Sequence, residues 1–128
     1  MNDKDLTESA IQQEIITWFN NRFPALRGLL FSVPNGGLRT KREANKLKHE
    51  GLTAGIPDLI FAYRNRAYFL EIKTETGVLS DVQREITEKL IVQGFSVCVC
   101  RSCKEVEIII MRILADHNDI NLTRNKAT

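Results

Sequence analysis

The sequence predicts a single α/β domain, with a mixed central sheet of about four strands flanked by helices in the chain order α-β-α-β-β-α-β-α. Two apolar runs, residues 55–63 and 67–73, enclose a short charged turn and predict an antiparallel hairpin. A helix-length segment then separates this hairpin from an apolar run at 95–100, which predicts a parallel strand pair. The chain has 128 residues, and 43% of them are hydrophobic, which is enough for one packed core.

The first segment, residues 6–22, predicts an amphipathic helix, because Ile11, Ile15 and Trp18 recur at helical spacing. Glu14 lies on the same apolar stripe. A carboxylate there is either a boundary residue that extends to water or a group aimed at a functional site.

A short strand and a glycine loop follow this helix. Phe23 and Pro24 end the helix, and residues 29–33 form an apolar strand. Residues 34–37, Pro-Asn-Gly-Gly, form a loop, since glycine permits a positive φ and the close approach of another backbone. The loop is either an ordinary turn or a segment whose N–H groups meet a phosphate.

Residues 41–50 predict a short basic helix that ends at Gly51. The segment 39–50 holds five lysines or arginines against two glutamates. Such a run is either a solvated helix face or a surface that binds phosphates. Including the preceding loop, the candidate phosphate contacts are Asn35, Gly36, Gly37, Arg39, Lys41, Arg42, Lys46 and Lys48.

Three ionisable residues of the hairpin lie where a sheet normally has none. Asp58 begins the first strand, whereas Glu71 and Lys73 end the second and, by alternation, share one face. Antiparallel pairing brings the start of the first strand beside the end of the second, so Asp58 should lie close to Glu71. This grouping costs free energy unless something uses it. Mg²⁺ or Mn²⁺ would use it, with Lys73 holding or deprotonating a bound water.

The remaining residues predict a helix, a buried strand and a second helix. Ser80 is a suitable N-cap, and Gln83 three residues later completes a capping box. The core face of this helix would consist of Val82, Ile86 and Leu90. The run 95–100 predicts a buried strand, and Ser102 with Glu105 forms a second capping box. The last helix is amphipathic, with apolar positions at Val106, Ile109, Ile110 and Ile113.

Composition narrows the class of protein. A net charge of +2 neither demands nor excludes nucleic acid. No run of about 18 apolar residues occurs, so we expect no transmembrane helix, and the polar N-terminus does not resemble a signal peptide. Three cysteines fit a reducing compartment better than a disulfide framework. We therefore expect a cytoplasmic protein with one domain over residues 1–128, a core of about 6–115 and a polar, frayed tail at 117–128.

The ordered set of motifs resembles the VRR-NUC branch of the PD-(D/E)XK nuclease superfamily, in its standalone bacterial and phage form. A Pro-Asp followed by Glu-x-Lys arises easily by chance, but the full set in 128 residues is much more specific. The resemblance covers roughly residues 8–103 and rests on Glu14, Pro34-Asn35-Gly36-Gly37, Gly55-Ile56-Pro57-Asp58, Glu71-Ile72-Lys73 and Gln83. It implies a restriction-endonuclease-like core and a Mg²⁺- or Mn²⁺-dependent deoxyribonuclease that hydrolyses phosphodiester bonds.

The resemblance also implies roles for individual residues. Lys73 would position or activate the attacking water, and Gln83 would orient that water or Lys73. Capping and catalysis would then use different rotamers of Gln83. Thr87 stands where some relatives have a tyrosine, so the extended glutamine motif is absent. The implied metal ligands are Asp58, Glu71, the backbone carbonyl of Ile72 and Glu14, and the basic residues at 35–48 would contact DNA.

Standalone relatives act as homodimers on branched DNA such as four-way junctions, and the resemblance implies the same here. The sequence supports a dimer only through the C-terminal helix, whose residues 108–111 are all apolar. The alternative is that these residues simply pack in the core.

Other functions compete with nuclease activity. A DNA-binding module without catalysis would be expected to have a broken acidic set, but Asp58, Glu71 and Lys73 are intact. Cys100 and Cys103 form a CxxC motif at a strand–helix junction, which suits a thiol redox pair because a helix N-terminus lowers thiol pKa. Structural zinc needs four ligands, and three cysteines with two distant histidines are a poor set.

Overall fold

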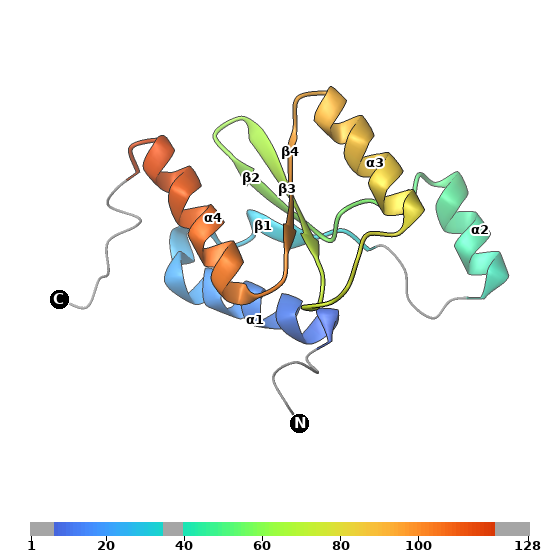
Figure 1. The fold of residues 1–128 in the computed structure, drawn as a ribbon, viewed down its shortest axis with the longest axis horizontal. Coiled ribbons are helices and arrows are strands. Elements are labelled where there is room, and N and C mark those ends of the chain that lie inside the picture. Colours follow the sequence, from blue (N-terminus) through green and yellow to red (C-terminus); the bar gives the residue numbers. More distant parts are fainter. Residues whose placement is uncertain (1–6, 35–39, 120–128) are drawn as a thin grey trace.

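A computed structural model describes residues 7–34 and 40–119 of the chain. In chain order the elements are α1 (Glu8–Arg22), the 3-10 helix η2 (Pro24–Leu26), β1 (Leu30–Ser32), α2 (Lys41–His49), β2 (Leu59–Tyr63), β3 (Arg66–Ile72), α3 (Asp81–Val92), β4 (Ser96–Cys100) and α4 (Cys103–Asp116) (Figure 1). This order confirms the predicted α/β fold. The predicted phosphate contacts Asn35, Gly36, Gly37 and Arg39 lie outside the described residues.

The four strands form one sheet in the order β1-β2-β3-β4. β2 pairs antiparallel with both β1 and β3, and β3 pairs parallel with β4, so the predicted hairpin and parallel pair are confirmed. The hairpin turn consists of Arg64 and Asn65, whose φ angles are 51° and 65°. A two-residue turn with both φ angles positive matches the twist of the flanking strands and fixes their register.

The hydrophobic core lies between one face of the sheet and the helices α1 and α4. Alternate residues of β2 face this core and are buried. The fully buried Phe19 of α1 meets the ring of Phe61 with 5.5 Å between centroids. Helix α4 contributes buried side chains at helical spacing, namely Cys103, Val106, Ile110, Ile113 and Leu114.

Helix α3 and strand β4 are less buried than the sequence predicts. Val82 is 46% exposed, no residue of α3 is buried, and the other expected core residues, Ile86 and Leu90, are half-buried. Strand β4 is an edge strand in which only Cys100 is buried. The reason is that α1 and α4 cover the same face of the sheet, while α3 alone packs near β4 on the other side (Figure 1).

Helix α2 projects away from the sheet (Figure 1). Its start is fixed by a capping box between Thr40 and Glu43. No α2 residue is buried, and the predicted basic face is solvent-exposed. Within the described ranges, no helix is both long and apolar enough to span a bilayer.

The first residues after α4 are held against the hairpin turn. The Tyr63 hydroxyl donates a hydrogen bond to the Asp119 carboxylate, and Arg64 pairs with the same group at 2.9 Å. The Tyr68 hydroxyl lies 3.5 Å from Nε2 of His117. The prediction of a tail frayed from His117 onward is therefore wrong for residues 117–119.

Candidate active site

The hairpin register places Asp58 opposite Glu71. Leu59 pairs with Leu70, so the residue before β2 lies across from the residue after Leu70. The Asp58 carboxylate is fixed in this position because its Oδ2 accepts a hydrogen bond from the backbone N–H of Ile72 at 2.8 Å. The two carboxylates therefore meet at one end of the sheet, as the sequence predicts.

Glu71 is a buried carboxyl group, with only 2% of its surface exposed. Burial raises its pKa from 4.5 to about 8, helped by the Asp58 charge and by a hydrogen bond between the two carboxyl groups. The Lys73 ammonium acts in the opposite direction and lowers the pKa of Glu71. Without a cation, the Asp58–Glu71 pair therefore retains a proton at neutral pH.

Lys73 is also buried, with 7% of its surface exposed. Its backbone N–H donates to the carbonyl of Cys100 at 3.0 Å, which extends the β3–β4 ladder by one residue. Alternation along the strand puts its side chain on the same face as Glu71. The Lys73 ammonium group is thus held beside the two carboxylates by the end of strand β3, and not by an exposed surface loop.

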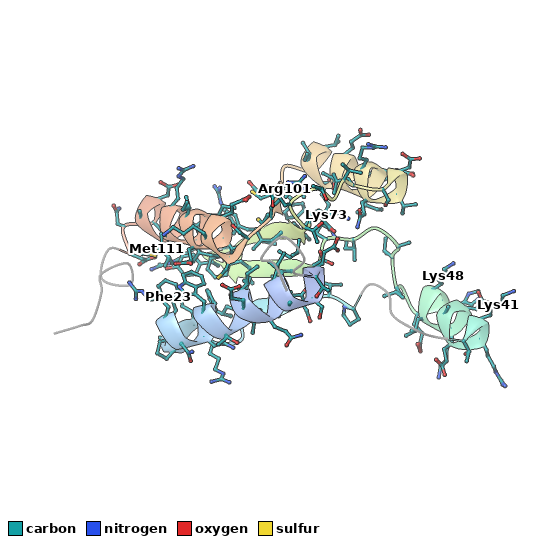
Figure 2. The ribbon with its side chains drawn as sticks, turned by 60° about the horizontal axis from the view of Figure 1, so that its bottom comes forward. Phe23, Lys41, Lys48, Lys73, Arg101 and Met111 are labelled. Atoms are coloured by element: carbon teal, nitrogen blue, oxygen red, sulfur yellow. The ribbon has the colours of Figure 1, made fainter. Side chains whose placement is uncertain are left out.

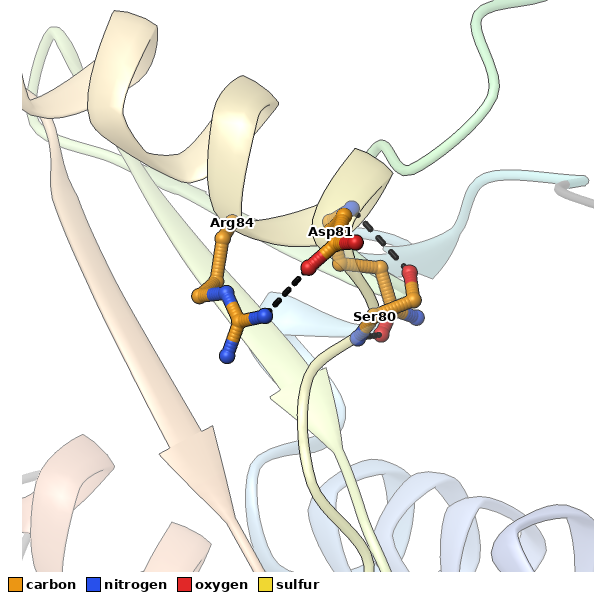
Figure 3. A network of polar contacts seen from close by, with 4 residues as sticks. Ser80, Asp81 and Arg84 are labelled. Atoms are coloured by element: carbon orange, nitrogen blue, oxygen red, sulfur yellow. Dashed lines mark hydrogen bonds and ion pairs between the residues drawn. The ribbon is translucent and has the colours of Figure 1, made fainter.

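Gln83 caps α3 and binds the acidic pair at the same time. Its Oε1 accepts from the backbone N–H of Ser80 at 2.9 Å, and its Nε2 donates to Oε1 of Glu71 at 3.0 Å. Figure 3 shows this start of α3, where Ser80 precedes Asp81 and Arg84. One rotamer makes both contacts, and the predicted role of Gln83 in orienting a water or Lys73 stays a prediction. The capping box thereby fixes the amide that holds Glu71.

The glycine of the Gly-Ile-Pro-Asp motif is required by a close approach of two backbones. Gly55 has a φ of +83°, and a Cβ atom there would lie 2.7 Å from the carbonyl oxygen of Val82. Any other residue would therefore push the start of α3 away from the loop that leads to Asp58. This contact sets the distance between the element carrying Gln83 and the strand carrying Asp58.

The charge of Glu8, another acid of α1, reaches Glu71, and the role of Glu14 at the metal site stays a prediction. The charge of Glu8 contributes to the raised pKa of Glu71, whereas the charge of Glu14 raises the pKa of the Cys103 thiol. Six residues separate the two acids, which corresponds to about 9 Å along the axis and to different helix faces. Glu8 lies in the first turn, after the N-cap Thr7. That position explains Glu8 as a helix-capping charge, which is why the sequence alone did not single it out.

The three cysteines do not form a reactive thiol site. Burial raises the pKa of Cys98, that of Cys100 to about 12 and that of Cys103 to about 11. Cys103 does begin α4, but desolvation outweighs the effect of the helix N-terminus. Reactive cysteines need a lowered pKa, so the geometry disfavours the redox alternative.

The basic residues of α2 lie apart from the acidic pair. Figure 2 shows Lys41 and Lys48 on the projecting helix, at a distance from Lys73. Arg42 and Lys46 are on the same helix, and its last turn also carries His49. Lys41, Arg42, Lys46, Lys48 and His49 are all exposed, so their side chains are available for phosphate contacts away from the acidic pair.

The donor set suits a hard divalent cation bound largely by water. Two carboxylates, Asp58 and Glu71, converge with the end of β3, where the Ile72 carbonyl also lies. Mg²⁺ typically takes one or two protein carboxylates and retains several waters. Across residues 7–34 and 40–119, no group of three or more His, Cys, Asp or Glu side chains is placed to hold a metal ion.

The chain is similar in sequence and in fold to known proteins. Residues 6–104 match the model of the VRR-NUC domain. A solved structure described as a VRR-NUC domain protein superimposes with a TM-score of 0.70 at 26% identity, covering 84% of this chain and 87% of the other. No curated protein matches the sequence. The sequence match and the structural match are therefore to the same kind of domain.

Proposed function

Because this chain belongs to the VRR-NUC family, whose domains are nuclease-like, we propose that it is a Mg²⁺- or Mn²⁺-dependent deoxyribonuclease. The single observation that supports this proposal best is the buried Glu71, which accepts a hydrogen bond from Gln83 and lies beside the Asp58 carboxylate. Two buried carboxylates repel each other, and a bound cation would offset this repulsion. The reaction is hydrolysis of a DNA phosphodiester bond.

Each residue of the site has a role in this proposal. Asp58, Glu71 and the Ile72 carbonyl would hold the cation, and an α1 carboxylate, Glu14 or Glu8, would hold a second cation or a bound water. When bound, the cation lowers the pKa of a water and stabilises charge on the phosphate. Lys73 positions that water and offsets the charge that develops on the phosphate oxygens. Gln83 keeps the Glu71 carboxylate turned toward the cation.

We propose that DNA contacts extend from this site to α2. Lys41, Arg42, Lys46 and Lys48 would contact backbone phosphates, which positions DNA without selecting a base sequence. Residues 7–34 and 40–119 form one sheet with its helices and no separate module for reading bases. Selectivity for branched DNA, such as a four-way junction, would therefore come from how the duplex arms lie between α2 and the acidic pair.

We further propose a homodimer, but through a different surface from the one that the sequence suggests. In α4, Ile110 is buried, Ile109 and Met111 pack partly against the core, and Ile108 is 50% exposed. More large apolar side chains are exposed on α3, on β4 and just before β4 than on α4, namely Val82, Ile91, Val92, Phe95 and Val99. A second copy would bury these residues from water.

Sedimentation velocity distinguishes the two surfaces. Val92 is 81% exposed on α3, so Val92→Asp should convert the dimer to monomers without changing the fold. The matched control is Ile108→Asp on α4, which should remain dimeric. A dimer lost only in the control would return the interface to α4, and a wild-type monomer at all concentrations would end the dimer proposal.

Cleavage of a panel of labelled DNAs tests the function itself. The panel contains linear duplex, single strand, a flap and a four-way junction, each with Mg²⁺ or Mn²⁺. We expect cleavage that EDTA stops and iodoacetamide does not affect, because burial raises the pKa of all three thiols and the cation is essential. Binding without cleavage of any DNA would favour the non-catalytic module, and inhibition by iodoacetamide alone would favour thiol chemistry.

A further inference from the structure

Arg101 holds the loop that connects the two halves of the proposed site. It lies between β4 and the N-cap of α4, and it is half-buried. Its Nη1 lies 2.7 Å from the carbonyl oxygen of Thr74, 3.2 Å from that of Glu75 and 2.6 Å from that of Gly77. One side chain thus joins three carbonyl groups of a loop that is distant in sequence.

This loop begins directly after Lys73 and ends at Ser80, the N-cap of α3. The Gly77 N–H donates to the Thr74 carbonyl at 3.2 Å, so the loop folds back on itself. A Cβ atom on Gly77 would lie 3.5 Å from Cδ of Lys73. The backbone that Arg101 fixes therefore packs against the stem of the Lys73 side chain. In Figure 2, Lys73 and Arg101 lie in the same region, where the sheet meets α3.

The backbone of Arg101 is held as firmly as its side chain. Its N–H donates to Oε1 of Glu105 at 3.2 Å, while Ser102 Oγ accepts from the Glu105 N–H at 3.2 Å. The second predicted capping box is therefore shifted, because Glu105 binds the N–H of Arg101 and not that of Ser102. This arrangement leaves the guanidinium directed at the loop, and in the described part of the chain it forms no ion pair with a carboxylate.

We propose that Arg101 is a positioning residue for the cleavage reaction, and this inference rests on the proposed nuclease function. It fixes the 74–77 loop, and through that loop it fixes the direction of the Lys73 ammonium and the start of the helix carrying Gln83. A lysine should not replace it fully, because its ammonium group is a point charge on a flexible stem, whereas the rigid, planar guanidinium holds Nη1 at the three carbonyls. Arg101 itself does not touch the DNA or the cation.

The test compares Arg101→Ala and Arg101→Lys with Arg112→Ala, in which an exposed arginine of α4 is removed. Cleavage is measured at saturating Mg²⁺ on the DNA that the wild type cuts best. Misplacement of a catalytic group by about 1 Å costs on the order of a hundredfold. We expect both Arg101 variants to lose about that factor in kcat with little change in KM, and Arg112→Ala to retain wild-type values.

Two further measurements separate positioning from a loss of fold. Exchange of the Gly77 amide, followed by NMR, should become at least about tenfold faster in Arg101→Ala, while the Leu70 amide in the β3 ladder is unchanged. Guanidinium ion at millimolar concentration should restore part of kcat in Arg101→Ala but not in Lys73→Met. If Arg101→Ala does not fold, Arg101→Lys is compared with Arg112→Ala instead.

An unchanged kcat in the folded Arg101 variants would overturn the proposal, even if Gly77 exchanged faster. An equal loss of kcat and of the Leu70 protection would also overturn it, because Arg101 would then only support the fold. If the wild-type protein cleaves no DNA, the proposed function fails instead. The Gly77 exchange still reports whether Arg101 fixes the loop, so the two failures are distinguishable.

Discussion

Lys73→Met is expected to abolish cleavage while the protein remains folded and bound to DNA. Methionine retains most of the aliphatic stem that packs near Gly77, so the loop at 74–77 should keep its position. The variant removes only the ammonium group, which positions the water and offsets the charge on the phosphate. Removing one such electrostatic element typically costs about a hundredfold or more in rate. Single-turnover cleavage with Mg²⁺ measures the loss.

Two controls define what this loss means. Lys89→Ala removes an exposed lysine of α3 that pairs with Glu85 at 3.7 Å, and it should leave the rate unchanged. Lys46→Ala combined with Lys48→Ala should raise the Kd for DNA and flatten its dependence on salt, with the rate at saturation retained. Full cleavage by Lys73→Met would remove Lys73 from the mechanism, whatever the behaviour of the controls.

Glu71→Gln is expected to abolish activity and, at the same time, to stabilise the metal-free protein at high pH. Glutamine has nearly the same shape, and its Oε1 can still accept the hydrogen bond from Gln83. Its amide N–H groups can donate to Asp58, which replaces the proton that the two carboxyl groups share. The substitution therefore removes a charge but conserves the contacts of a buried side chain.

The sign of the pH effect follows from the raised pKa of Glu71. The pKa of this group is about 8 in the folded protein and about 4.5 when unfolded. Between these values the folded state binds more protons, so its stability falls as pH rises. The contribution is complete below about pH 4.5 and lost above about pH 8, at up to about 1.4 kcal/mol per pH unit. The variant lacks this dependence, and the difference should reach a few kcal/mol at pH 9.

Urea denaturation at several pH values in EDTA measures this difference, since other titrating groups affect both proteins equally. Parallel stability curves for the two proteins would contradict the raised pKa of Glu71. Added Mg²⁺ should stabilise the wild type more than Glu71→Gln, because binding of a ligand to the folded state shifts unfolding. A cation that stabilises both equally would bind elsewhere.

The two expected results share one physical cause. Two carboxyl groups and an ammonium group are held together in a buried place where they weaken the metal-free fold. Active sites commonly keep such unfavourable groups because the reaction needs them. Stability and activity should therefore change in opposite directions at Glu71, which a purely structural carboxylate would not do.

The hairpin and the positions of its charged residues could be predicted from the sequence. Period-two alternation and a short charged turn are local signals, and they determine that Asp58 lies opposite Glu71 and that Lys73 shares the face of Glu71. The order of helices and strands also follows from local periodicity. The family resemblance depends on the same residues, so it could be stated before any coordinates.

Other features depend on how separate elements pack. Which acid of α1 faces the site, Glu8 or Glu14, depends on the rotation of that helix over the sheet, and both lie near apolar positions. The apolar stripe of α3 predicts burial, but burial also needs a second layer, and α1 and α4 both cover the other face. The local pattern of α3 cannot show whether another element will cover the helix.

The sequence by itself determined the strand pairing and the acidic pair, because both follow from spacing along one continuous stretch. Only the tertiary structure decided that Gln83 caps α3 and binds Glu71 in one rotamer, that Gly55 must admit the Val82 carbonyl, and that Arg101 reaches the carbonyls of 74–77. Each of these contacts joins residues from different elements. Their distances depend on the packing of whole helices and strands, which no local pattern encodes.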